Sequence, residues 1–267
     1  MTMEVLETPP VGGKLRFAGM ILGLTLAAVQ TAGADGIDPE ADKILRSMSA
    51  YLGGLSNLSV SADVDTEVID LEGQKLQFSS SATMVAARPN KLYVRRQGVV
   101  ADLELKFDGE TLTVLEKDHN AYHQTKVSDT IDDVLDAVRN ELGLDAPAAE
   151  LFYADAYPSL SDGINDSLYL GTTFVNGVEC HHLAFRENEW DWQIWVSAGD
   201  EPLPMKYIIT TKWLTGAPQH SVRFRDWNTK PQIAENQFAF SAPDGAERLE
   251  SVSVDELGEL VFGEKKQ

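Results

Sequence analysis

The chain has 267 residues, and its 42 acidic side chains outnumber its 22 lysines and arginines, so the formal net charge is −20. This charge argues against a nucleic-acid partner, because phosphates require a basic counter-surface, and it disfavours nonspecific docking on anionic membranes. Cys180 is the single cysteine, which excludes an intramolecular disulfide and a Cys-rich zinc or redox site. A basic partner or a divalent cation stays compatible with the charge, and so does a charge that only keeps the protein soluble.

The N-terminal segment has the parts of a secretory signal peptide. Lys14 and Arg16 precede the apolar run 17–29, and small residues follow at 32–34. The run has roughly 13 residues, fewer than the roughly 20 that a membrane-spanning helix needs. We therefore predict a signal peptide at 1–34, cleaved after Ala34, and a single domain at 35–267. An uncleaved anchor is the alternative. No later stretch is apolar enough to span a bilayer, so we do not expect an integral membrane protein.

The first predicted element of the mature chain is a helix at 39–52. Asp38 followed by Pro39 is typical of an N-cap and a first helical position. Apolar residues then recur at helical spacing until two glycines end the pattern: Ile44, Leu45, Met48, Tyr51 and Leu52. This spacing predicts one buried stripe.

From residue 58 the apolar period changes from 3.6 to 2, which indicates β-strands. Six meandering strands are predicted up to Thr125, with Asp108-Gly109 as a hairpin turn. A helix follows from Ile131 to Leu142, with Ser128 or Thr130 as its N-cap, and a shorter helix at 147–153. Five more strands are expected up to Asp226, with a hairpin turn at 176–177 and a possible short helix at 254–261.

Ten or eleven strands are too many for a flat open sheet, and the apolar stripes of the helices must be buried. We therefore predict an α+β fold, mainly antiparallel β, in which a strongly curved half-open β-barrel is covered by helices on its concave side. Between the sheet and the helices lies either a packed core or a cavity.

Three segments resemble a group of predicted periplasmic proteins of unknown function in the outer-membrane lipoprotein carrier and receptor superfamily. They are Gly-Val-Glu-Cys-His-His-Leu-Ala-Phe at 177–185, Trp-Gln-Ile-Trp-Val at 192–196 and Pro-Leu-Pro-Met-Lys-Tyr at 202–207. The order of elements and the ending at 238–245 are also similar to that superfamily. The resemblance implies a LolA-like half-barrel with a helical lid and a periplasmic location. It implies lipid or lipoprotein binding more loosely, because relatives of this fold also serve as sensors and regulators.

No catalytic machinery is recognisable. The chain has no G-x-S-x-G elbow and no Gly-rich phosphate loop. His119 and His123 have a spacing that chelates on a helix but lie where a turn enters a strand, and the adjacent His181 and His182 point to opposite faces of their strand. We predict no enzyme, no metal site and no cofactor.

Aromatic side chains on strands either pack a core or line a cavity. The candidates for a cavity wall are Trp190, Trp192, Tyr207, Trp213 and Phe224, with Phe78 and Phe107. The sequence thus favours a non-enzymatic binding protein whose cavity, of roughly 300 Å³ or more, holds a lipid, an acylated protein or another apolar molecule. The alternative is an envelope interaction or regulatory module that binds a basic protein through its acidic surface.

Overall fold

The computed structural model describes residues 36–99, 102–140, 142, 146, 148–254 and 260–261. The predicted signal peptide at 1–34 and its cleavage site lie outside these residues and stay predictions, as does the assignment of 35–267 to one domain. In the described part of the chain no helix is long and apolar enough to cross a membrane.

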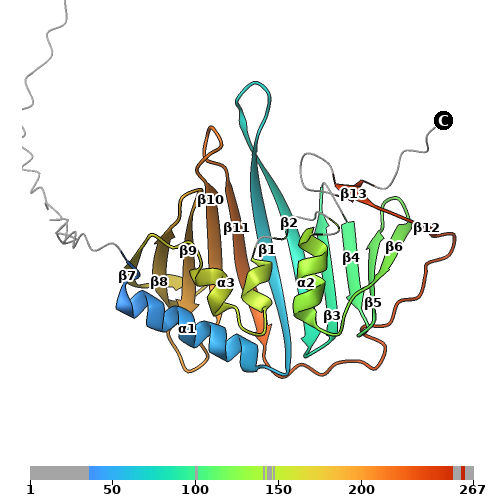
Figure 1. Cartoon of the computed structure of the whole chain (residues 1–267), viewed down its shortest axis with the longest axis horizontal. Helices are drawn as coiled ribbons and strands as arrows, with labels where there is room; N and C mark the ends of the chain where they lie inside the picture. The colour runs from blue at the N-terminus through green and yellow to red at the C-terminus, as the bar shows by residue number, and fades with distance from the viewer. Residues whose placement is uncertain are drawn as a thin grey trace, which may run out of the picture. The chain divides into compact units, whose positions relative to one another are not determined.

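Twelve strands form one open sheet, with β1 near its centre (Figure 1). Its spatial order is β12-β6-β5-β4-β3-β2-β1-β11-β10-β9-β8-β7. Every pair is antiparallel except β12 with β6. The strands are β1 Asn57–Ile69, β2 Lys75–Ala87, β3 Lys91–Gly98, β4 Asp102–Phe107, β5 Thr111–Glu116, β6 Ala121–Lys126, β7 Asp166–Val175, β8 Val178–Arg186, β9 Trp190–Ser197, β10 Pro204–Thr211, β11 Gln219–Asn228 and β12 Glu247–Leu249.

The predicted fold class is confirmed. The two expected groups of six and five strands are β1–β6 and β7–β11, and helices lie over one face of the sheet (Figure 1). Strand β12 was not predicted; it extends the sheet beyond β6. At the opposite edge, β7 carries an irregularity in its register between Tyr169 and Thr172, with Gly171 at φ 92°. The predicted turn at Asn176-Gly177 is also present, because both residues have positive φ as a tight hairpin requires.

Helix α1 (Pro39–Gly54) crosses the lower ends of several strands in Figure 1. Its predicted cap is confirmed: Asp38 Oδ1 accepts hydrogen bonds from the backbone N–H groups of Glu40 and Ala41 at 2.8 and 3.1 Å. The predicted stripe is buried, with Leu45, Met48 and Leu52 at zero exposure. The helix runs two residues further than the predicted 39–52.

Helix α2 (Ile131–Asn140) is capped by Thr130 and not by Ser128. Thr130 Oγ1 accepts a hydrogen bond from the Asp133 N–H at 3.1 Å, and the Asp133 carboxylate accepts one from the Thr130 N–H at 3.1 Å. This is a reciprocal capping arrangement. The expected short helix at 147–153 is a single 3₁₀ turn, η1 (Ala149–Phe152), and an unpredicted helix, α3 (Tyr157–Ser161), follows it.

The prediction of a helix at 254–261 is wrong. Ser253–Val254 (β13) pairs antiparallel with Leu260–Val261 (β14). Valine loses rotamer freedom in a helix and fits a pleated strand better, which accounts for the difference.

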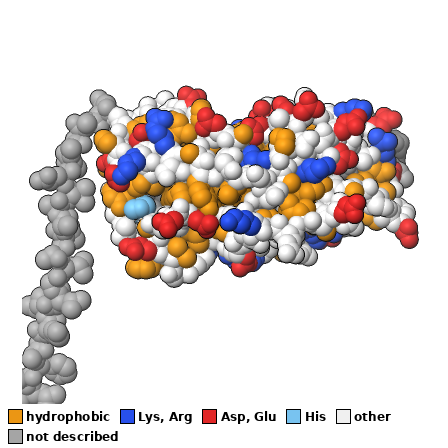
Figure 2. All heavy atoms as spheres, turned by 90° about the horizontal axis from the view of Figure 1, so that it is seen from below, with side chains coloured by type: hydrophobic (Ala, Val, Ile, Leu, Met, Phe, Trp, Pro, Cys, Tyr) orange, Lys and Arg blue, Asp and Glu red, His pale blue; other side chains and the backbone are white. Residues whose placement is uncertain are grey.

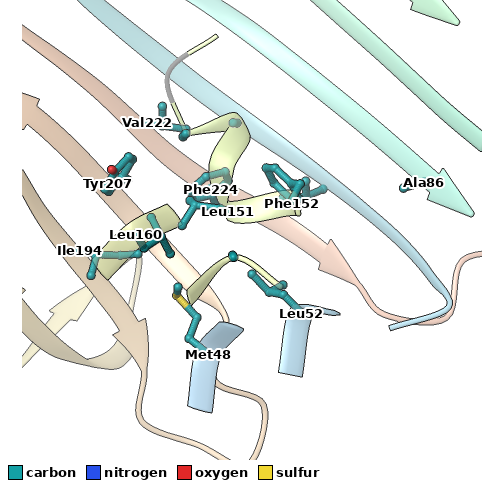
Figure 3. Close-up of a cluster of buried hydrophobic side chains, with 14 of the residues drawn as sticks. Met48, Leu52, Ala86, Leu151, Phe152, Leu160, Ile194, Tyr207, Val222 and Phe224 are labelled. Carbon is teal, nitrogen blue, oxygen red and sulfur yellow. The ribbon is translucent and has the colours of Figure 1, made fainter. Parts of the chain in front are cut away.

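A packed hydrophobic core lies on the concave face, and Figure 3 shows part of it. Side chains from α1, η1 and α3 meet side chains of β9, β10 and β11 in this cluster: Met48, Leu52, Leu151, Phe152, Leu160, Ile194, Tyr207 and Phe224. Apolar contacts therefore hold these three helical elements to the sheet.

We expect Leu45→Ala to lower the free energy of unfolding by about 2–5 kcal/mol, because it leaves a cavity beneath α1. Leu71→Ala is the matched control, since Leu71 at the β1–β2 turn is fully exposed, and it should change stability by less than about 0.5 kcal/mol. Urea unfolding followed by tryptophan fluorescence measures both. Equal effects of the two substitutions would contradict the packing of α1 against the sheet.

Candidate functional site

A partly open cavity of about 280 Å³ lies between the concave face of the sheet and the segment formed by α2 and η1. Its volume is at the lower limit of the roughly 300–1,000 Å³ of ligand sites. The lining residues come from β1–β5, β11, α2 and the η1 region: Val60, Ala62, Val64, Thr66, Val68, Phe78, Ala82, Met84, Leu92, Val94, Arg96, Leu103, Leu105, Val114, Val134, Leu135, Val138, Ala146, Ala148, Ala149, Phe152, His220, Val222 and Phe224. The concave side thus holds both a packed core and a cavity.

The cavity exists where small side chains face the helical cover. Ala62 of β1 pairs with Ala82 of β2, and both line the cavity. On the opposite wall α2 contributes the short aliphatic side chains of Val134 and Val138. Interiors are normally close-packed, so a pair of alanines in the middle of the sheet leaves space that larger residues would fill. Figure 2 shows hydrophobic side chains gathered along the middle of one face, with acidic and basic side chains around them.

Polar contacts fasten the cover to the sheet. Arg88 Nη2 donates to the Phe152 carbonyl at 2.7 Å, and the Tyr207 hydroxyl donates to Glu150 Oε1 at 3.0 Å. Burial raises the pKa of Tyr207 well above its ordinary value, and the Glu150 carboxylate raises it further. The phenol therefore keeps its proton and remains a hydrogen-bond donor.

Three polar residues interrupt the apolar lining in the described part of the chain: Thr66, Arg96 and His220. Thr66 Oγ1 lies 3.0 Å from His220 Nδ1. The pKa of His220 is lowered to about 4, mainly by burial and then by the positive charge of Arg96, while Asp65 opposes the shift. His220 is therefore neutral near pH 7. We call these three residues the polar cluster.

The residues predicted for the cavity wall have different positions. Phe78 and Phe224 line the cavity. Trp192, Tyr207 and Phe107 are buried outside the lining, and the rings of Trp192 and Tyr207 meet edge to face with centroids 5.7 Å apart. Whether any of these five side chains contacts a ligand stays a prediction.

Trp190 and Trp213 are 38% and 64% exposed and lie outside the cavity lining; their role in ligand contact also stays a prediction.

The sequence analysis missed the polar cluster, although a signal was present. Thr66 has the strand phase of Val64 and Val68, Arg96 that of Leu92 and Val94, and His220 that of Val222 and Phe224. A polar residue in the inward phase of a strand is the signal to look for.

Within the described residues no group of three or more His, Cys, Asp or Glu side chains is arranged to hold a metal ion. His181 lies 3.0 Å from the Tyr169 hydroxyl, whereas His182 stacks on Trp195 with centroids 4.1 Å apart. Cys180 is buried, and burial raises the pKa of its thiol, which favours the unreactive protonated form.

The structure combines an open curved sheet, a helical cover and an apolar cavity between them. The chain belongs to the family of predicted periplasmic proteins DUF2092, whose model matches residues 41–251. This confirms the resemblance to that family and, at the level of its description, the periplasmic location. No curated protein sequence matches the chain.

Several solved structures have a similar backbone fold. An uncharacterized conserved protein from Thermus thermophilus has 9% identity and a TM-score of 0.48, over 79% of this chain and 99% of that one. LprF from Mycobacterium bovis has 13% identity and a TM-score of 0.47, over 76% and 99%. The LolA superfamily protein NE2245 from Nitrosomonas europaea has 8% identity and a TM-score of 0.38, over 74% and 97%. This likeness carries no ligand or activity over to the present chain.

The lowered pKa of His220 makes a prediction about stability. The unfolded chain takes up a proton at His220 below about pH 6.5, whereas the folded protein takes it up only near pH 4. Between these values the unfolded state binds more protons, so the stability that neutral His220 contributes is complete above about pH 6.5 and is lost as the pH falls. The loss amounts to at most about 3 kcal/mol.

We expect the stability of the wild type, minus that of His220→Gln, to fall by up to about 3 kcal/mol between pH 7.5 and pH 4. Glutamine stays neutral throughout, and the groups common to both proteins cancel in the difference. Urea unfolding at a series of pH values measures it. A difference independent of pH would show that His220 titrates normally in the folded protein.

Proposed function

We propose that this protein is a periplasmic, non-enzymatic binding protein that holds an apolar or amphipathic molecule in the cavity beneath α2 and η1. The observation that carries the proposal is the lining, which is apolar apart from the polar cluster. A lipid or the acyl chain of an acylated protein has the matching chemistry. Phe78 and Phe224, which line the cavity, are the proposed aromatic contacts.

The energetics of transfer support this function. An acyl chain of about 14 carbons gains roughly 11 kcal/mol on leaving water, at about 0.8 kcal/mol per CH₂. A bilayer offers the same gain, so an apolar cavity only has to match the bilayer for uptake and release to be nearly neutral in free energy. Such a carrier needs no catalytic group and no energy source at the site itself.

The first test is native mass spectrometry of the protein purified from the periplasm, followed by organic extraction and lipid analysis. We expect a co-purifying apolar species at a defined stoichiometry, and displacement of the uncharged dye N-phenyl-1-naphthylamine by that species. A clean apo mass together with no binding of the dye or of a lipid panel would overturn the proposal. Crosslinking in intact cells would then test the alternative of a protein partner.

A variant whose cavity is filled by a larger side chain should no longer bind the dye. We expect Ala82→Trp to reduce dye binding at least about tenfold, because the indole occupies the space between Ala82 and α2. Thr83→Trp is the matched control, since Thr83 is the next residue of β2 and its side chain is exposed. Thermal unfolding shows whether each variant is folded. Unchanged binding by folded Ala82→Trp would place the bound molecule elsewhere on the protein.

A further inference from the structure

The inward positions of the central strands change in polarity along the cavity. In β1 the inward residues Val60, Ala62 and Val64 are apolar, and the next one, Thr66, is polar. Thr66 pairs with His220 on one side and with Phe78 on the other. The cavity is therefore apolar toward α1, and toward the β1–β2 hairpin it acquires hydrogen-bonding groups among apolar residues such as Val68 and Phe78.

Arg96 adds a positive charge to the cavity lining. It lies in β3 opposite Ala82, and its Nε donates to Ser80 Oγ at 3.4 Å. Ser80 is the next inward residue of β2 toward the hairpin, so the guanidinium extends in the direction of Thr66 and His220. An arginine remains charged in proteins, and the charge of Arg96 reaches His220, whose pKa it lowers.

We propose that the polar cluster of Thr66, Arg96 and His220 is a subsite for the anionic head group, a carboxylate or a phosphate, of an amphiphile whose alkyl chain occupies the apolar end of the cavity. The inference rests on the proposed function, because it names the class of ligand for the same cavity.

Three physical arguments select an anionic amphiphile. A guanidinium recognises carboxylate and phosphate oxygens with strong, directional hydrogen bonds. The Thr66 hydroxyl, one inward row beyond the Val64–Ser80 pair toward the hairpin, adds a further hydrogen-bonding group. The apolar walls strengthen this attraction, since they keep the local dielectric constant low. The net charge of −20 repels anions at long range, so a preference for an anionic ligand must arise from a local cation. An alkyl chain, in turn, matches the apolar end around Val60 and Met84.

The experiment compares tetradecanol, myristate and tetradecyl phosphate, which share one alkyl chain and differ only in the head group. Displacement of N-phenyl-1-naphthylamine measures the affinity of each. We expect the wild type to bind the two anionic amphiphiles at least about tenfold more tightly than the alcohol. Arg96→Met should bind the two anionic amphiphiles about as tightly as the alcohol, while its affinity for tetradecanol stays unchanged. Arg96→Lys should restore part of the preference for the anionic amphiphiles.

Arg223→Met is the matched control, since it removes one positive charge from the exposed outward face of β11, and it should keep the preference. A wild type that binds the alcohol and the anions equally, or a preference that survives in Arg96→Met, would overturn the inference and leave the proposed function standing. Displacement of myristate by inorganic phosphate alone would overturn it as well, because the site would then recognise a free anion. Failure of the uncharged dye and all three amphiphiles to bind would instead overturn the proposed function. The wild-type comparison requires no variant, so a failure of Arg96→Met to fold leaves the inference testable.

Discussion

The pairing of β1 with β11 is the interaction on which the rest of the structure depends. It joins two antiparallel meanders, β1–β6 and β7–β11, into one continuous sheet. Residues far apart in the chain become neighbours through it: Ala62 lies opposite Phe224, and Thr66 lies opposite His220. Without this pairing the cavity would lose one wall, and the polar cluster would lose His220. The site is therefore a product of long-range topology and not of any local motif.

The helices cover the concave face unequally, so that a packed core and a cavity lie on the same face of the sheet. Over β9–β11 the side chains of α1, η1 and α3 interdigitate with bulky residues such as Ile194 and Tyr207. Over β1–β5 the cover is α2, which meets a floor containing Ala62 and Ala82. The alanine pair leaves space in the sheet beneath α2 although larger residues such as Met84 and Leu103 also line the cavity.

The period of the apolar residues was enough to predict both groups of strands, the N-terminal helix with its Asp38 cap and the curved sheet with helices on one face. These features depend on local spacing and on the need to bury one face. Strand β12 was beyond this reasoning, since three residues carry no period and its pairing with β6 is parallel and long-range. The 3₁₀ turn η1 and the short α3 were equally hard to predict, because helices of so few residues are fixed by tertiary packing rather than propensity.

The site was predicted only in part. Aromatic residues on strands were chosen as candidates for the cavity wall, and Phe78 and Phe224 do line the cavity, as do Ala62 and Ala82, which the sequence analysis did not consider. The polar cluster combines one residue from each of β1, β3 and β11. Sequence phase marks each of these residues as inward-facing, but only the strand order β3-β2-β1-β11 shows that they lie close to one another in one sheet.

The two edges of the sheet are protected in different ways, and this bears on solubility in a crowded compartment. Strand β12 occupies part of the outer edge of β6, so fewer backbone donors and acceptors there are available to a neighbouring molecule. At the other edge, within the residues that the structure describes, β7 meets only the isolated bridge between Gly36 and Asp166, and its register irregularity near Gly171 breaks the regular spacing that a second chain would need for edge-to-edge pairing. Both features reduce the number of regularly spaced backbone groups that a second sheet would need for edge-to-edge pairing.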